Sequence, residues 1–376
     1  MAYIEYLDEL AGERLSFCGF HPRLRRYIRL DRRLVFDRIA AIAAGWKSGS
    51  AIRANRVGLA QWRELFFPVS RLDGKRIIVK VSPDHLEHRS RIKGLVDTEQ
   101  APLVIMIHDL LPIEYPEFSG RGGDRTQQQR LKVVAEFSAH IVANSQDTAD
   151  SIKRYFGSND CPPVTAIPLG FTPMASSTFS ALQDGMNLVS DEPYFVCIGT
   201  IEPRKNHMML LHLWRQISKF AELHDTSVPK LYIVGRRGWE NENIIDLLER
   251  SPFVRAHVIE AGEMGDEAVA RLLFGARALL APSFAEGFGL PVAEALACGI
   301  PVICSDIAPH REIGGEVPDY VDPLDGPTWQ RLIFEYACEE SAARDAQLHR
   351  LRDWSIRSWD KHIHEVYDIC KHLGMA

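Results

Sequence analysis

Two glutamates, Glu286 and Glu294, enclose a glycine turn with the residue types of a ligand-binding site, E-G-F-G-L-P-V-A-E. The apolar run 278–281 precedes it, as a buried strand would, and Pro291 stands where a helix would begin. Glycine lets backbone N–H groups approach a ligand closely, and a helix N-terminus attracts negative charge. Glu294 could accept hydrogen bonds from a ribose diol. Glu286, which has no cation near it in the sequence, could accept them from sugar hydroxyl groups.

A second loop, 199–206, carries two adjacent cations, Arg204 and Lys205, in G-T-I-E-P-R-K-N. Two cations beside a glycine turn and a helix start suit a diphosphate. Alone, such a pair is more typical of a solvated surface. Its coincidence with the glutamates favours a nucleoside diphosphate that bears a polyhydroxylated group. No D-x-D run follows a strand, so we expect these cations to neutralise the phosphate charge without Mg²⁺, and we expect no metal site.

A polar pair, His108–Asp109, directly follows the apolar run 102–107. Ligand contacts in open α/β sheets lie at such carboxyl ends of strands, so we interpret the pair as functional. The alternative is that the two side chains only cap the loop.

These residues need an α/β framework, and the chain alternates strand and helix patterns twice. Its 376 residues exceed one typical core, which predicts two domains, 1–173 and 192–353, joined by a polar linker at 174–191. Apolar runs predict strands of parallel sheets in both halves, at 76–81, 102–107, 140–143, 164–167, 194–198, 230–234, 254–261, 278–281, 301–304 and 320–323.

Composition and charge describe a soluble globular protein, with 46% hydrophobic and 25% charged residues. A net charge of −6 gives no reason to expect nucleic acid. The acidic opening lacks a secretory signal, and no apolar run reaches the length of a membrane span. Seven scattered cysteines without C-x-x-C spacing are typical of reduced thiols, so we expect a cytoplasmic protein.

Eight arginines gather between positions 14 and 38, which sets this region apart. The spacing of apolar residues predicts a helix over 23–44 with a basic face. Such a helix could lie on an anionic membrane surface. The alternative is an ordinary surface helix whose apolar face packs on the core.

Several enzyme classes are disfavoured because their motifs are missing. The chain contains no G-x-G-x-x-G and no G-x-x-x-x-G-K-[ST], which argues against a nicotinamide dehydrogenase and a P-loop NTPase. It contains no G-x-S-x-G, which argues against an α/β-hydrolase.

Taken together, the motifs resemble those of retaining GT-B glycosyltransferases of family four. The resemblance rests on E-G-F-G-L-P-V-A-E-A, I-G-T-I-E-P-R-K-N, C-G-I-P-V-I-C-S-D-I and H-D-L-L-P, and it extends from about residue 102 to the C-terminus. It implies two Rossmann-like domains with parallel sheets that face each other across a cleft. The first domain would take the acceptor and the second the sugar nucleotide. A C-terminal helix within 354–376 would cross back to the first domain.

The resemblance also implies roles for single residues. Arg204 and Lys205 would hold the diphosphate and stabilise the leaving group, and Glu294 would bind ribose. Glu286 would hold the donor sugar, and His108 would reach it from the opposite domain. Many members carry an arginine where this chain has Thr200, so Arg204 would substitute for it. The whole donor-binding set is Gly199, Thr200, Arg204, Lys205, Gly235, Glu286, Gly287, Phe288, Gly289, Leu290 and Glu294.

The implied activity is metal-independent hexosyl transfer with retention of configuration and no cofactor. Relatives with P-R-K-N and H-D-x-x-P resemble bacterial polysaccharide mannosyltransferases, so we expect GDP-mannose before a UDP-sugar as the donor. The acceptor would be a saccharide or a lipid-linked saccharide in polysaccharide or lipopolysaccharide assembly at the inner face of the membrane. Two alternatives stay open: a sugar-nucleotide epimerase of the same fold, and a non-catalytic partner subunit that binds the donor.

Overall fold

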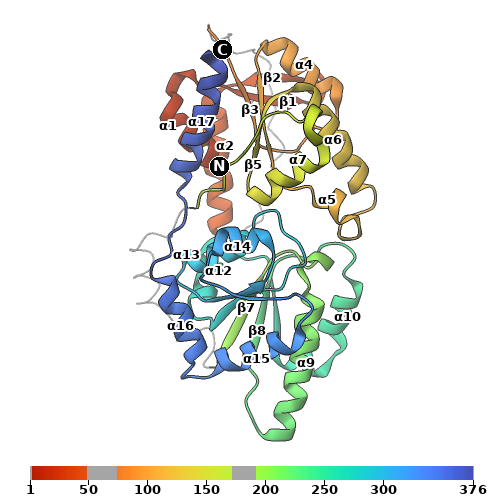
Figure 1. Ribbon diagram of the computed structural model, residues 1–376, viewed down its shortest axis with the longest axis vertical. Helices are drawn as coiled ribbons and strands as arrows, with labels where there is room; N and C mark the ends of the chain where they lie inside the picture. Colours follow the sequence, from red (N-terminus) through yellow and green to blue (C-terminus); the bar gives the residue numbers. More distant parts are fainter. Residues whose placement is uncertain (1, 49–73, 172–191, 376) are drawn as a thin grey trace. The chain divides into compact units, whose positions relative to one another are not determined.

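The computed structural model describes residues 2–48, 74–171 and 192–375, which form two compact units (Figure 1). One unit comprises Met1–Gly170 together with Arg357–Ala376, and the other comprises Phe171–Ile356. The predicted linker at 174–191 lies outside the described residues.

The second unit contains a sheet of six parallel strands: β7 (Tyr194–Ile198), β8 (Lys230–Val234), β9 (Val258–Gly262), β10 (Ala278–Ala281), β11 (Val302–Ser305) and β12 (Asp319–Val321). Their spatial order is β12-β11-β10-β7-β8-β9. After β7, the strands β8 and β9 extend the sheet on one side. The chain then crosses to the other side of β7, where β10, β11 and β12 follow in order. The β7–β10 junction is therefore the topological switch point, where doubly wound folds bind ligands.

Helices cover both faces of this sheet, which explains why its strands are continuously apolar. Phe195 and Cys197 pack on one face with α9 (His207–His224) and α15 (Gly326–Ala337). Tyr194 and Val196 pack on the other with α12 (Asp266–Phe274) and α13 (Leu290–Ala297). The other helices among the described residues of this unit are the 3₁₀ turn η3 (Pro203–Lys205), α10 (Glu242–Arg250), α11 (Pro252–His257), α14 (Ala308–Gly314) and α16 (Ala342–Leu351).

The first unit contains four described parallel strands in sequence order: β3 (Ile78–Lys80), β4 (Leu103–Ile107), β5 (Ser138–Ala143) and β6 (Val164–Ala166). One face packs on α4 (Arg89–Glu99), α6 (Gly123–Phe137) and α7 (Gln146–Asp160). The short helices η1 (Gly12–Arg14), α5 (Leu111–Glu114) and η2 (Pro116–Phe118) belong to its connections.

The last helix, α17 (Trp359–Met375), covers the other face of this first sheet beside α1 (Ala2–Ala11), as Figure 1 shows. Its His362 ring donates from Nδ1 to the Pro168 carbonyl (2.9 Å) and accepts at Nε2 from the Tyr3 hydroxyl (2.6 Å). A Cβ at Gly170 would lie 2.3 Å from the Trp359 Cα, so only glycine fits there. The predicted return of the C-terminal helix to the first domain is confirmed.

The predicted basic helix over 23–44 is wrong in its first part. A β-hairpin of β1 (Phe17–His21) and β2 (Arg26–Leu30) comes first, followed by α2 (Arg32–Ser48). Arg29 is buried and pairs with Glu99 (2.6 Å), so it does not belong to a solvent-facing basic surface. The apolar spacing misled because over so short a segment it also suits a half-buried hairpin.

The predicted strand at 254–261 is also corrected. Its first residues belong to α11, and β9 begins only at Val258. Pro252 lies in the first turn of α11, where proline is favoured because its missing N–H would have no partner there.

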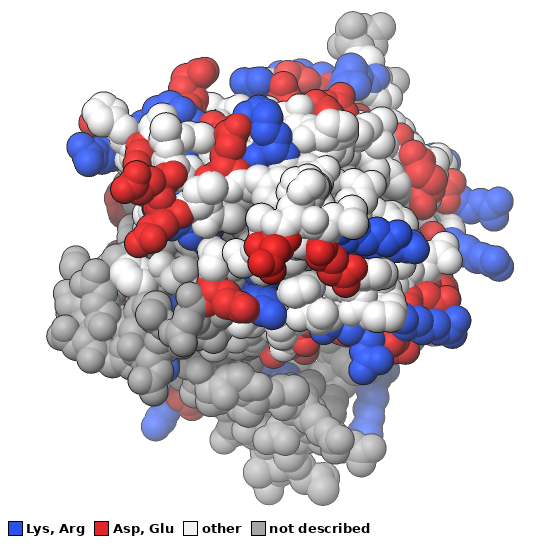
Figure 2. All heavy atoms as spheres, turned by 90° about the horizontal axis from the view of Figure 1, so that it is seen from below, with Lys and Arg blue, Asp and Glu red and all other residues white. Residues whose placement is uncertain are grey.

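None of the described helices combines the length and the apolar composition needed to cross a membrane. On the face of the molecule in Figure 2, acidic and basic side chains are interspersed among uncharged ones. That face therefore lacks the continuous basic surface that nucleic acid phosphates require.

Candidate active site

The loops after β7 and β10 meet at the switch point of the second sheet. Since these strands are neighbours, their carboxyl ends bring 199–206 next to the turn that begins at Pro282. The Phe284 N–H donates to the Arg204 carbonyl (2.9 Å), which ties the two loops together through the backbone.

Glu286 lies at the centre of this junction. One carboxylate oxygen accepts from Lys205 Nζ (2.6 Å) and Ser283 Oγ (2.8 Å), and the other accepts from Arg204 Nη1 (2.7 Å). Burial by itself would raise the pKa of Glu286, but the attraction of Lys205 and Arg204 outweighs it and holds the pKa at about 2. Glu286 has no cation near it in the sequence, but the fold supplies Lys205 by bringing together residues 81 positions apart.

The two cations are engaged to different extents. Arg204 donates from Nε and Nη2 to Glu202 (3.0 and 2.7 Å) and from Nη1 to Glu286 and the Ala285 carbonyl (2.7 Å each). Four of the five N–H groups of its guanidinium are therefore used within the protein. Among the described residues Lys205 has one ion-pair partner, Glu286, which leaves ammonium N–H groups to offer a ligand. Arg204 thus fastens the loops, whereas Lys205 is suited to bind an anion.

A small pocket opens beside this cluster. Its walls come from the ends of β7 and β10, the start of α13 and one side chain of α14: Cys197, Ile198, Lys205, Ala281, Pro282, Ser283, Glu286, Pro291, Val292 and His310. Lys205 contributes to these walls and Arg204 does not.

Three of the predicted donor-binding residues position Lys205 through close backbone packing. Gly199 has φ +148°, and a Cβ there would lie 3.0 Å from Lys205 Cε. A Cβ at Gly235 would lie 2.1 Å from the Gly199 carbonyl oxygen, so the turn after β8 packs directly against the turn after β7. Thr200 completes the contact, because its Cγ2 would lie 2.6 Å from a Cβ at Gly238.

The glycine turn leads into α13 as predicted. Gly289 caps the helix with φ +96°, and Pro291 lies in its first turn. Phe288 is buried, whereas the Leu290 side chain is exposed. Gly287 lies between Glu286 and Phe288 on the same turn.

Glu294 makes no ion pair or side-chain hydrogen bond with any described residue. Burial, with a smaller contribution from Asp266, raises the pKa of Glu294 to about 7. Near neutral pH this carboxyl is thus partly protonated, unlike that of Glu286, and it can both donate and accept.

His108 belongs to the first unit, where it follows β4 at the carboxyl edge of the sheet. Its Nε2 donates to the Val81 carbonyl (2.9 Å), and its own backbone carbonyl accepts from Thr148 Oγ1 (3.3 Å). Asp109 caps the following turn by accepting from the Leu111 N–H (3.1 Å). All other predicted site residues lie in the second unit.

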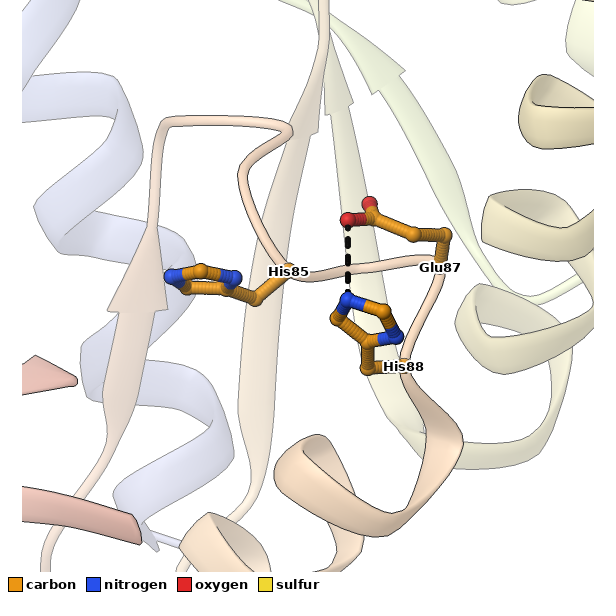
Figure 3. Close-up of side chains that lie close together, drawn as sticks. All are labelled: His85, Glu87 and His88. Carbon is orange, nitrogen blue, oxygen red and sulfur yellow. Dashed lines mark ion pairs between the residues drawn. The ribbon is translucent and has the colours of Figure 1, made fainter. Parts of the chain in front are cut away.

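A group of potential metal ligands, His85, Glu87 and His88, follows β3 with ligand atoms within 4.8 Å of one another (Figure 3). Arg91 Nη1 lies 2.6 Å from His85 Nδ1, and because arginine only donates, the neutral ring must carry its proton on Nε2. That leaves His85 no lone pair for a metal. Arg130 also binds Glu87 (3.2 Å). The hydrogen bonds of this group do not fit metal ligation, and the absence of a metal site stays a prediction.

Sequence reasoning missed three residues that complete the site: Glu202, Ser283 and His310. Ser283 lies just beyond the end of β10, so its position after an apolar run was a usable signal. His310 lies on α14, after a different strand, and nothing in the sequence connects it to the glycine turn.

Comparison with known proteins gives the family. Residues 181–316 match the model for "Glycosyl transferases group 1". The chain is 32% identical over 260 residues to the O-antigen chain mannosyltransferase B of Escherichia coli, covering 68% of this chain and 67% of that protein. It is 30% identical over 226 residues to the serotype-specific mannosyltransferase WbdA of Escherichia coli, covering 56% of this chain but only 27% of the length of that relative.

Among solved structures, Anabaena Alr3699/HepE in complex with UDP-glucose superposes with a TM-score of 0.61 at 16% identity, covering 79% of this chain and 78% of that one. This likeness shows the fold, which is α/β of the GT-B kind with two parallel sheets. The chain belongs to the group 1 glycosyltransferases, the GT4 family.

Proposed function

We propose that the protein is a retaining hexosyltransferase that takes mannose from GDP-mannose. The observation that carries this proposal is the Lys205–Glu286 pair at the β7–β10 switch point, beside the glycine turn that starts α13. The mannose donor is supported by the mannosyltransferases to which the chain is similar.

In this proposal the second unit binds the donor and the first unit receives the acceptor. Lys205 donates to the diphosphate and stabilises the charge that develops on it as the glycosidic bond breaks. Arg204 holds the loop that carries Lys205 against the loop that carries Glu286, through its hydrogen bonds to Ala285 and Glu286. The N–H groups of Phe288–Leu290 approach the donor from the start of α13, Glu294 binds the ribose, and His108 acts from the first unit.

Charge neutralisation by Lys205 makes a divalent metal unnecessary for leaving-group stabilisation. The acceptor is a saccharide or a lipid-linked saccharide of bacterial polysaccharide assembly, with the protein peripheral to the inner face of an anionic membrane. This placement is supported by the exposed arginines at the tip of the β1–β2 hairpin, Arg25 and Arg26.

A donor panel tests the proposal. Purified protein is assayed with GDP-mannose and other GDP- and UDP-sugars for binding, transfer and donor hydrolysis, with and without EDTA. Lys205→Ala should lower kcat by roughly 10²–10³-fold, the usual cost of losing one charge-stabilising donor. Lys219→Ala, at an exposed position of α9, is the matched control and should leave kcat unchanged.

Four outcomes would contradict it. Failure to bind any sugar nucleotide would remove the donor site. Release of an epimerised sugar nucleotide would favour the epimerase, and donor binding without turnover would favour a non-catalytic subunit. Complete loss of transfer in EDTA would overturn the metal-independent mechanism.

A further inference from the structure

His310 has a defined protonation state in the donor pocket. The residue is 1% exposed, and Nδ1 lies 2.9 Å from the Ser305 carbonyl oxygen. A carbonyl only accepts, so Nδ1 must carry the ring proton. Burial lowers the pKa of His310 despite the nearby Glu286 carboxylate, so the ring is neutral at physiological pH. Nε2 therefore presents a lone pair.

That lone pair lies at the pocket. His310 contributes to the pocket walls together with Lys205 and Glu286. Its Cδ2–Nε2 edge faces the glycine turn, since a Cβ at Gly289 would lie 3.0 Å from Cδ2 and 3.6 Å from Nε2. No described residue forms a hydrogen bond to Nε2.

The other polar side chains of the pocket already form hydrogen bonds within the protein. Both Glu286 oxygens accept from protein donors, and the Ser283 hydroxyl proton is directed at one of them. Lys205 can only donate. Nε2 of His310 is therefore a side-chain acceptor in the pocket to which no described residue donates, and a hydroxyl group of a ligand would supply that donor.

We propose that His310 Nε2 accepts a hydrogen bond from one hydroxyl group of the transferred sugar and so helps to select the donor. This inference rests on the proposed function, because it assumes a sugar nucleotide in this pocket. It adds hydroxyl recognition by a neutral imidazole beside the Glu286 carboxylate, which already accepts three hydrogen bonds from the protein. The site thereby distinguishes the sugar from the nucleotide, which contacts the Lys205 side of the pocket.

Calorimetric titrations of GDP-mannose and of GDP into wild type, His310→Leu and His310→Gln test the inference. His310→Leu should weaken GDP-mannose binding about tenfold, the scale of one lost hydrogen bond, and leave GDP binding within about twofold. His310→Gln keeps an acceptor oxygen and should recover part of the loss. If the leucine variant does not fold, the glutamine variant decides, with a partial loss expected for GDP-mannose alone.

Monodeoxy analogues of GDP-mannose provide the second measurement. The analogue that lacks the recognised hydroxyl should bind wild type about tenfold more weakly, and it should bind His310→Leu no more weakly than GDP-mannose does. Equal weakening of GDP and GDP-mannose in the variant would show that His310 only supports the Gly289 turn, and would overturn the inference. So would deoxy losses that are identical in wild type and variant.

Failure of this inference can be told from failure of the proposed function. If wild type binds both ligands and His310→Leu changes neither, only the inference is wrong. If wild type binds no member of the donor panel, the proposed function is wrong and the inference falls with it.

Discussion

At the scale of single residues, the two glutamates of the glycine turn and its helix have opposite charge states. Glu286 is buried against Lys205 and Arg204, which hold its pKa at about 2. Glu294 is buried without such a partner, so desolvation decides and its pKa rises to about 7. The same residue type on one short segment is thus an obligate anion at one position and a titrating group at the other.

Glu294→Gln should change how stability depends on pH. The folded-state pKa is raised above the usual 4.5, so the folded protein binds this proton more tightly than the unfolded chain, and the stabilisation is lost as pH rises through about 7. Glutamine does not titrate. Between pH 5 and pH 8 the free energy of unfolding of the variant should therefore rise relative to wild type by an amount on the order of 1–3 kcal/mol, and its thermal midpoint should rise with it.

Melting curves across this pH range provide the measurement. Glu242→Gln, at an exposed position of α10, controls for general effects of charge removal. Parallel pH profiles for wild type and Glu294→Gln would show that burial does not raise the pKa of the Glu294 carboxyl.

At the scale of elements, α13 has a glycine at each end, and the two glycines are required for different reasons. Gly289 precedes the first turn and Gly299 follows the last, with φ values of +96° and +74°. A Cβ at Gly289 would press on the His310 ring, whereas a Cβ at Gly299 meets nothing within 4 Å. One end of the helix is therefore constrained by the pocket, and the other only by backbone conformation.

Gly289→Ala and Gly299→Ala separate these two effects. Each should cost about 1 kcal/mol for placing alanine at positive φ. Only Gly289→Ala should also displace His310, with a further drop in thermal midpoint and at least a severalfold loss of GDP-mannose affinity. Differential scanning fluorimetry and calorimetric titration check the pair, and equal donor affinity in both variants would refute the assigned contact between the turn and the ring.

At the scale of the whole molecule, the chain returns at its end to the unit where it began. Helix α17 packs with α1 on the first sheet, so that unit combines segments that lie far apart in the sequence. The β1–β2 hairpin of the same unit presents Arg25 and Arg26 to solvent, while Arg29 is held by the carboxylate of Glu99. Exposed arginines are therefore present at the hairpin tip and also on α2, where Arg33 and Arg38 face solvent.

Co-flotation with anionic vesicles tests membrane contact by this tip. Arg25→Ser with Arg26→Ser should lower the bound fraction, since each basic residue near an anionic surface contributes roughly 1 kcal/mol. Arg250→Ser with Arg255→Ser, at exposed positions of the second unit, is the control. Arg29 is left intact because breaking its buried ion pair would destabilise the fold. Unchanged flotation of the hairpin variant would exclude this contact.

Local rules in the sequence were enough to predict much of the framework. The apolar strands β4, β7, β8 and β10 and the glycine–proline start of α13 follow from hydrophobicity and backbone preferences within a few residues. The β1–β2 hairpin could not be predicted from such local rules, because the burial of Arg29 depends on Glu99, which is 70 positions away.

The sequence by itself determined the α/β alternation, the glycine turn and the adjacent cations Arg204 and Lys205, since these depend on neighbours along the chain. Only the tertiary structure decided what those residues do. The adjacency of β7 and β10 puts Glu286 against both cations, and α14 brings the His310 ring to the same pocket. Charge state and hydrogen-bonding capacity depend on partners across the fold, and strand order in a parallel sheet selects those partners.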